Sequence, residues 1–112
     1  MDGHSLLKPG ELQLILRNHP NKIPIYVTKS KYADKDLPDI SKHKFLIPNN
    51  YLMGEFIYSI RRWIKIRPEQ AIFLFIGNNV PSSTLTMDEV YNKYKSSDGM
   101  LRITYTSENT FG

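Results

Sequence analysis

The sequence predicts an α+β fold of the β-grasp type, a four-stranded mixed sheet crossed by one long helix. Segments 22–28 and 44–47 are predicted as strands, the first from its period of two in apolar side chains. Residues 51–67 follow with apolar side chains at helical spacing, so a hairpin is followed by a helix that crosses back over the sheet. The chain has 112 residues, 40% of them hydrophobic, which suits one core and one domain. A short second helix, two further strands and an N-terminal helical extension complete the predicted fold.

The N-terminal part predicts a short helix at 11–17. Ser5 is its expected cap, and His19 and Pro20 end it. The helix carries more apolar residues than one face can hold. We therefore expect part of its apolar surface to be left for another contact.

The next segments predict a hairpin. In segment 22–28 every second side chain is aliphatic and lies on one face of the strand. Residues 44–47 form the second strand, which Pro48 ends. The polar and charged stretch 29–39 predicts a solvated hairpin loop between them.

The following pattern predicts the long helix and a buried strand. Asn49 and Asn50 are the expected N-caps of the helix at 51–67, which Pro68 ends. Residues 71–76 are apolar at every position, as expected for a strand that is covered on both faces.

The last third of the chain predicts a short helix and a final strand. Thr86-Met87-Asp88-Glu89 is a capping box, which predicts a helix at 87–95. Residues 97–99 form a turn before a strand at 101–105, which we place parallel to the first strand in the centre of the sheet. The predicted parts are a helical extension at 1–20, a β-grasp domain at 21–105 and a flexible tail at 106–112.

The composition excludes several kinds of chemistry. Without cysteine the chain has no disulfide, no Cys-ligated metal and no cysteine nucleophile. His4, His19 and His43 lack the spacing of metal ligands, and no Gly-rich phosphate loop follows a strand. We therefore expect no enzymatic activity, no metal and no cofactor. The longest apolar run, 71–76, is too short for a membrane span and the N-terminus lacks a signal-peptide core, so a soluble cytoplasmic protein is expected.

The charge favours an acidic partner. The net charge is +4, from 15 Lys and Arg against 11 Asp and Glu. Basic residues at 42–44 and 61–67, with Trp63 among them, are compatible with nucleic-acid binding. The excess charge is modest and no RNA-binding signature is present, so an acidic peptide explains it more simply.

The second strand is the expected site for such a peptide. A short strand ended by proline is typical of a sheet edge, where an extended peptide can add as a further strand. We expect a pocket on each face, formed by Leu46 with Pro24, Tyr26 and the N-terminal helix, and by Phe45, Ile47, Pro48 and Tyr51 with the long helix. A peptide-binding module that is not conjugated to anything is one function that these residues support.

Gly112 supports a second function. A tail without secondary-structure period that ends in a residue without Cβ suits a narrow enzyme channel in which the terminal carboxylate is adenylated and transferred. Any thiol needed for that transfer must come from a partner, because the chain has none.

An ordered set of segments resembles a known family. The segments are NKIPI at 21–25, LPDI at 37–40, KHKFLIP at 42–48, GEFIY at 54–58, IR at 60–61, PEQAIFLF at 68–75, DG at 98–99 and YTSENTFG at 105–112. Together they resemble, from about residue 11 to residue 112, the autophagy-related ubiquitin-like modifiers of the GABARAP type.

The resemblance implies a β-grasp core with added N-terminal helices and a modifier that is not an enzyme. It implies that an activating enzyme adenylates Gly112, that a conjugating enzyme carries it as a thioester, and that it is attached to phosphatidylethanolamine on the autophagosome membrane. A processing and deconjugating cysteine protease and cargo receptors with acidic aromatic-x-x-aliphatic motifs are the other implied partners. The chain is expected to be a monomer that does not bind nucleic acid.

By position, the resemblance also implies the residues that contact the motif. The aromatic pocket would consist of Glu11, Ile15, Pro24, Tyr26, Lys44, Leu46 and Met100. The aliphatic pocket would consist of Phe45, Ile47, Pro48, Tyr51, Phe56 and Ser59. The acidic flank of the motif would meet Lys22, Lys42 and Lys44.

Four positions depart from the family's usual residues. Tyr26 stands where an aliphatic residue is common, Met100 where Phe is common, Ser59 where an apolar residue is common, and Trp63 where a basic residue is common. The N-terminal region is also shorter than the usual two helices.

Overall fold

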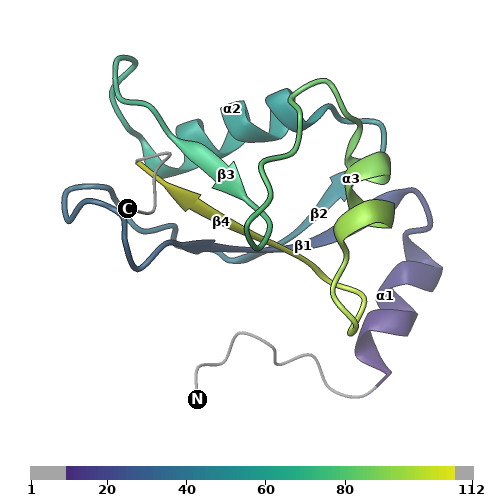
Figure 1. Cartoon of the computed structure of the whole chain (residues 1–112). Coiled ribbons are helices and arrows are strands. Elements are labelled where there is room, and N and C mark those ends of the chain that lie inside the picture. The colour runs from purple at the N-terminus through teal and green to yellow at the C-terminus, as the bar shows by residue number, and fades with distance from the viewer. Residues whose placement is uncertain (1–9, 108–112) are drawn as a thin grey trace.

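The computed structural model describes residues 10–107, which fold as one sheet with three helices. The strand order is β2-β1-β4-β3, with β1 and β4 parallel in the centre and antiparallel pairs on either side (Figure 1). This arrangement confirms the predicted α+β fold of the β-grasp type. In chain order the elements are α1 (Glu11–Asn18), β1 (Lys22–Lys29), β2 (Lys44–Pro48), α2 (Met53–Ile64), β3 (Phe73–Phe75), α3 (Met87–Tyr94) and β4 (Leu101–Thr106).

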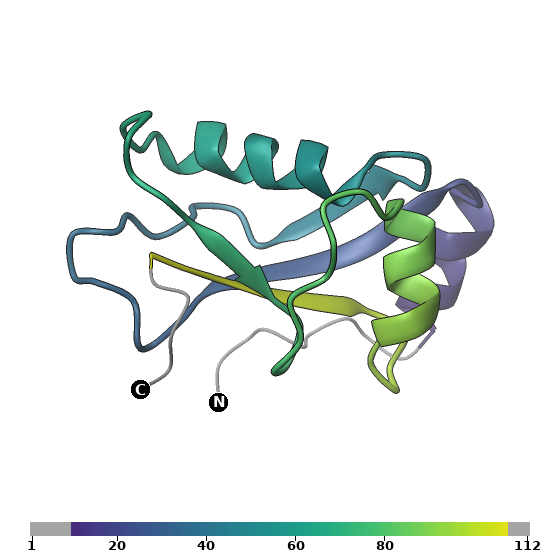
Figure 2. The ribbon, with the colours of Figure 1, turned by 45° about the horizontal axis from the view of Figure 1, so that its top comes forward.

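The main core lies between the sheet and α2, which crosses one face of the sheet (Figure 2). Alternation along β1 directs Ile25 and Val27 to this face, where Phe56 and Ile60 of α2 join the same buried cluster. None of these four side chains has exposed surface. The hydrophobic effect therefore fixes α2 over β1 and the neighbouring strands.

A second, smaller cluster lies on the other face of the sheet. Tyr26 follows Ile25 in β1 and so points to the opposite face, where it packs with Leu12 of α1 and with Met100. Leu16 of α1 is partly buried against this cluster. This smaller cluster attaches α1 to one end of the sheet.

Helix α2 begins later than the pattern predicts. Its N-cap is Leu52, so the expectation that Asn49 or Asn50 caps the helix is wrong. The Leu52 N–H donates a hydrogen bond of 2.8 Å to the Glu55 carboxylate, which satisfies one of the free donors at the helix start. Asn49 continues the pairing of β2 with β1 instead, because its N–H donates to the carbonyl of Asn21.

Helix α2 also ends earlier than predicted. It ends at Ile64 because Lys65 adopts a left-handed conformation with φ of 58°, three residues before Pro68. The guanidinium of Arg61 donates to three backbone carbonyls within 67–70. Arg61 therefore holds the connection from α2 to β3.

The prediction of a solvated loop between β1 and β2 is wrong in part. Leu37, within the predicted loop 29–39, is only 1% exposed and belongs to the main core, as does Ile40 directly after it at 4%. The Tyr105 hydroxyl of β4 donates a hydrogen bond of 2.7 Å to the carbonyl of Pro38. The loop is thus anchored to the sheet at its centre.

The last two strands of the chain also differ in length from the prediction. β3 is shorter than the segment 71–76, whereas β4 extends to Thr106, which pairs with Phe73. The sheet therefore includes one residue of the segment predicted as a tail. The expectation that Ser5 caps α1 is wrong, because the N-cap of this helix is Gly10. Ser5 itself and the terminal Gly112 lie outside the described residues.

Helix α3 follows the prediction at its start. The Thr86 hydroxyl accepts a hydrogen bond from the Glu89 N–H, and the Glu89 carboxylate accepts one from the Thr86 N–H. This reciprocal pair confirms the capping box.

Replacing Tyr105 by Phe tests how firmly the loop is anchored. Loss of the hydrogen bond to Pro38 should lower the free energy of unfolding by about 1 kcal/mol at neutral pH. Burial, with a contribution from the nearby Asp39 carboxylate, raises the pKa of the Tyr105 hydroxyl to about 12 from an ordinary value of 10.0. The folded state therefore keeps the proton of the Tyr105 hydroxyl to a higher pH than the unfolded state does. The contribution of this hydroxyl to the free energy of unfolding is complete below its ordinary pKa and declines as the pH rises toward 12.

Urea unfolding at neutral pH and at several alkaline pH values measures both effects. Wild-type protein should lose more stability across the alkaline range than Tyr105→Phe. An identical pH dependence in the two proteins would show that the hydroxyl is not held protonated by the fold.

Candidate functional site

Strand β2 lies at one edge of the sheet and pairs with β1. Backbone hydrogen bonds at the two ends of this pairing establish its pattern. At one end the Val27 N–H donates to the His43 carbonyl over 2.8 Å, and at the other the Asn49 N–H donates to the Asn21 carbonyl over 2.9 Å. The pairs Val27–His43 and Asn21–Asn49 both continue the register in which β1 pairs with β2, and both are hydrogen-bonded.

Bonded and non-bonded pairs alternate along an antiparallel ladder, so these two bonds determine where every group of β2 points. The backbone groups of Phe45 and Ile47 point toward β1. Those of Lys44 and Leu46 point toward the open edge, where no strand of the described residues pairs with them. Pro48 follows without an N–H and ends the edge.

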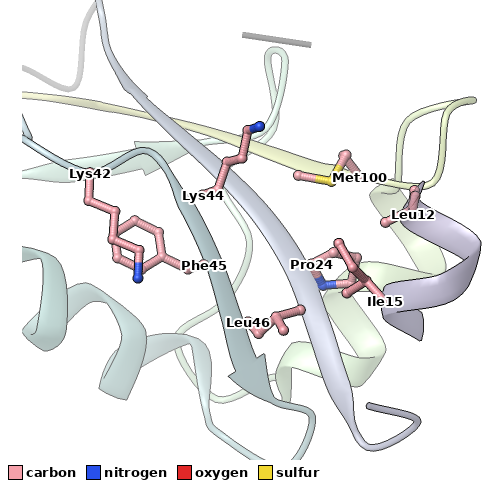
Figure 3. A pocket seen from close by; sticks show the side chains of 8 residues that line it. All are labelled: Leu12, Ile15, Pro24, Lys42, Lys44, Phe45, Leu46 and Met100. Carbon is pink, nitrogen blue, oxygen red and sulfur yellow. The ribbon is translucent and has the colours of Figure 1, made fainter. Parts of the chain in front are cut away.

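A cavity of about 340 Å³ opens beside β2 on the side of α1, and we name it the α1–β2 cavity. Figure 3 shows its lining side chains, which come from α1, β1, β2 and the segments just before β2 and β4. Most of them are apolar, as in ordinary ligand sites. They are Leu12, Ile15, Pro24, Lys42, Lys44, Phe45, Leu46 and Met100.

Gly99 holds α1 close to the start of β4. Its φ is 90°, and a Cβ at this position would lie 2.8 Å from Cδ2 of Leu12, so glycine suits both the turn and the close approach. The Tyr91 hydroxyl donates a hydrogen bond of 2.7 Å to the Gly99 carbonyl. This turn places Met100 beside Leu12 in one wall of the cavity.

The structure brings most of the predicted aromatic pocket together. Five of its predicted residues line the α1–β2 cavity, namely Ile15, Pro24, Lys44, Leu46 and Met100. Tyr26 does not, because it is only 8% exposed and packs beneath α1 with Leu12. Glu11 lies exposed in the first turn of α1 and does not line the cavity.

Sequence reasoning placed Leu12 in neither pocket, although it lines this cavity. Two other lining residues were predicted for other parts of the site, Lys42 for the acidic flank and Phe45 for the aliphatic pocket. Leu12 and Ile15 are three positions apart, a spacing that places both on one face of a helix. Because the helix has four apolar residues, this pair did not stand out from the others.

A second cavity, of about 490 Å³, lies on the side of β2 that faces α2, and we name it the β2–α2 cavity. Phe45 and Leu46 line both cavities, so the two meet along β2. The full lining is Ile40, Ser41, Lys42, Phe45, Leu46, Ile47, Arg62, Trp63 and Lys65.

The structure divides the predicted aliphatic pocket. Phe45 and Ile47 line the β2–α2 cavity, whereas Tyr51 and Ser59 line a different hollow along α2. Phe56 has no exposed surface and belongs to the main core. Pro48 is half-buried and lines none of these hollows.

Trp63 and Ile40 are the apolar side chains of this cavity that sequence reasoning missed. The Trp63 indole stacks on the Phe45 ring, with centroids 4.4 Å apart and an interplanar angle of 3°. Two features of the sequence pointed to Trp63, its position as a lone aromatic residue among basic ones and its departure from the basic residue common in the family.

The charges around both cavities are positive. Lys42 and Lys44 are exposed beside the open edge, and Arg62 and Lys65 lie at the β2–α2 cavity. Lys22 is exposed at the far end of the β1–β2 pair and lines neither cavity. Among the described residues that line the two cavities there is no Asp or Glu. This surface favours a ligand with negative charge.

Residues 10–107 hold neither of two other kinds of site. That part of the chain holds no group of three or more His, Cys, Asp or Glu placed to bind a metal ion. It also holds no helix with the length and apolar character that crossing a membrane requires.

Residues 8–112 match a protein family described as "Autophagy protein Atg8 ubiquitin like". Autophagy-related protein 8B of Oryza sativa subsp. indica is 39% identical over 105 residues, which cover 94% of this chain and 87% of the relative. Autophagy-related protein 8 of Mycosarcoma maydis is 40% identical over 111 residues, which cover 97% and 92% of the two chains.

Solved structures show the same similarity. Plasmodium falciparum Atg8, in complex with an Atg3 peptide from the same organism, superposes with a TM-score of 0.79 and 35% identity, over 88% of this chain and 86% of that one. Trypanosoma brucei ATG8 superposes with a TM-score of 0.79 and 31% identity, over 89% and 84% of the two chains.

Proposed function

Because the chain belongs to the Atg8 family of ubiquitin-like autophagy proteins, we propose that it is attached through Gly112 to phosphatidylethanolamine and that it binds acidic peptides along β2. A protein of this family is a ubiquitin-like modifier and not an enzyme. In the proposed role, the chain moves from a cytoplasmic pool to the autophagosome membrane and holds cargo receptors there.

The observation that carries the peptide-binding proposal is the open edge of β2 between two cavities. Lys44 and Leu46 each direct an N–H and a C=O outward, so an added strand can form the hydrogen bonds that an edge leaves unused. Main-chain bonds of this kind provide affinity for any extended peptide. The cavities then select the side chains.

The positions of the two cavities suit anchors three residues apart. Side chains of a strand alternate between its faces, so residues i and i+3 of an added strand lie on opposite faces, about 10 Å apart along the strand. An aromatic residue can then enter the α1–β2 cavity while an aliphatic residue three positions later enters the β2–α2 cavity. Carboxylates flanking the motif would meet Lys42 and Lys44.

Lipid attachment explains how a chain with such a site acts at a membrane. Phosphatidylethanolamine carries two acyl chains, and about 0.8 kcal/mol per buried CH₂ makes two chains a stable anchor where one is marginal. The chain has no cysteine, so the thioester steps would use the thiols of an activating and a conjugating enzyme. A cysteine protease would process and release the modifier.

The Plasmodium relative, solved with an Atg3 peptide, supports a conjugating enzyme as one peptide partner. We extend this to the present chain: a segment of its conjugating enzyme and its cargo receptors would bind at the same edge and compete with one another.

Calorimetric titration with an acidic peptide that carries an aromatic-x-x-aliphatic core tests the peptide-binding proposal. We expect saturable binding that weakens as the NaCl concentration rises, because surface charges are screened within about 10 Å at 0.1 M salt. Lys42→Glu should weaken binding about threefold to tenfold. Lys35→Glu, the same charge change in an exposed loop that lines neither cavity, is the matched control and should leave binding unchanged.

The absence of measurable binding by wild-type protein would contradict the proposal. Equal weakening by Lys42→Glu and Lys35→Glu would show that net charge, rather than the edge of β2, attracts the peptide.

A further inference from the structure

Trp63 forms an aromatic wall in the β2–α2 cavity. One face of its indole stacks on Phe45 at 4.4 Å, and Phe56 contacts it edge-on with centroids 6.1 Å apart. Phe56 is completely buried in the main core, so through this contact the core holds one part of the indole in place. The Trp63 side chain is therefore positioned by two rings on two different elements.

Much of this wall remains open to a ligand. Trp63 is 40% exposed although it lines the cavity. Phe45 covers one face of the indole and Phe56 also contacts the ring, so the exposed surface lies on the rest of the side chain. Ile40 and Ile47 supply the remaining apolar lining. An aromatic side chain that enters here can form a stacked or edge-to-face contact with Trp63, whereas an aliphatic one makes only dispersion contacts with it.

The surrounding charge limits what can approach this wall. Lys42, Arg62 and Lys65 line the cavity, and the Lys42 Nζ atom lies 5.2 Å from the centroid of the Phe45 ring. A cationic ligand side chain, which an open indole face would otherwise attract, is repelled by these three groups. An uncharged aromatic side chain with carboxylates beside it fits both the wall and the charge.

We propose that Trp63 is a specificity-determining residue that makes the β2–α2 cavity prefer an aromatic over an aliphatic side chain at the second anchor of an acidic peptide. The inference rests on the proposed peptide binding at β2 and refines its second anchor. An aromatic pair is worth 0.5–1.5 kcal/mol beyond its buried area, so we expect the preference to be about threefold to tenfold in affinity.

Two acidic peptides that differ only at the second anchor test this inference. One carries Phe-x-x-Phe and the other Phe-x-x-Leu, and neither contains Trp. Because Trp63 is the single Trp of the chain, its fluorescence reports directly on the cavity while calorimetry measures affinity. We expect the Phe-x-x-Phe peptide to bind more tightly to wild-type protein and to change the Trp63 emission on saturation.

Variants separate the role of the indole from a general effect on folding. Trp63→Ala should reduce the preference to less than about twofold, and Trp63→Phe, which keeps a ring on Phe45, should restore most of it. Tyr58→Ala is the matched control, because Tyr58 is a 63% exposed aromatic residue on the same helix that does not line this cavity. It should retain the preference in full.

The results distinguish this inference from the proposal beneath it. Binding of neither peptide would overturn the peptide-binding proposal and this refinement together. Equal affinities for both peptides in wild-type protein, or binding with unchanged Trp63 emission, would overturn the role of Trp63 alone and leave binding at β2 standing.

Discussion

Replacing Gly112 by Ala should abolish formation of the phosphatidylethanolamine conjugate. The reaction requires the terminal carboxylate to reach an adenylating centre and then the thiols of two enzymes, and a residue without Cβ passes most easily through a narrow channel. A displacement of about 1 Å at a reacting group costs about a hundredfold in rate, so a single added methyl group is enough to suppress the reaction. The measurement uses purified activating and conjugating enzymes of the pathway, ATP and liposomes that contain phosphatidylethanolamine.

Two comparisons make this result specific. Thr110→Ala, a change to Ala near the same end of the chain, should conjugate at close to the wild-type rate. Gly112→Ala should still bind the acidic peptide as wild-type protein does, because the proposed binding residues belong to α1, β1, β2, α2 and the segments beside them. If Gly112→Ala and wild type conjugate equally well, or if neither conjugates, the chain is better described as an unconjugated peptide-binding module.

Local patterns were sufficient to predict most of the fold. The period-two and helical patterns predict β1, β2 and α2 because each element buries one face, and a side chain's direction follows from its position in the element. The cap of α2 could not be found in this way. Asn49 is a good cap by residue type, but its N–H donates to the Asn21 carbonyl in the pairing of β1 with β2. The chain therefore remains paired at Asn49, and the helix begins only after Leu52.

The loop between β1 and β2 shows the same limit. Leu37 and Ile40 are isolated apolar residues in a polar stretch, so no period marks them as buried. Their burial depends on the sheet, including the bond from Tyr105 to Pro38 across 67 residues of sequence. Contacts of that range are invisible to local patterns.

The site was predictable where it depends on alternation within a strand. Lys44 and Leu46 share one face of β2, and both line the α1–β2 cavity. Phe56 was assigned to a pocket by position in the resemblance, although its helical spacing with Ile60 already indicated the core. The stacking of Trp63 on Phe45 depends on how α2 crosses β2, which neither segment reveals alone.

Amide hydrogen exchange along β2 tests the addition of a peptide strand at this edge most directly, and we expect a large change in exchange rate. In the free protein the amide groups of Lys44 and Leu46 face the open edge, whereas those of Phe45 and Ile47 point toward β1. A peptide that adds as a strand must bond to the first pair and leave the second pair as it is. The alternation within one strand provides its own internal control.

The decisive measurement is therefore residue-resolved amide exchange of β2, with and without a saturating acidic peptide. We expect exchange of the Lys44 amide to slow by about tenfold or more, because a hydrogen bond to the peptide must open first, while exchange of the Phe45 and Ile47 amides changes little. Leu46 should respond as Lys44 does wherever the bound strand reaches it. Unchanged exchange at both Lys44 and Leu46 in a saturated complex would show that the peptide binds elsewhere and would contradict strand addition at β2.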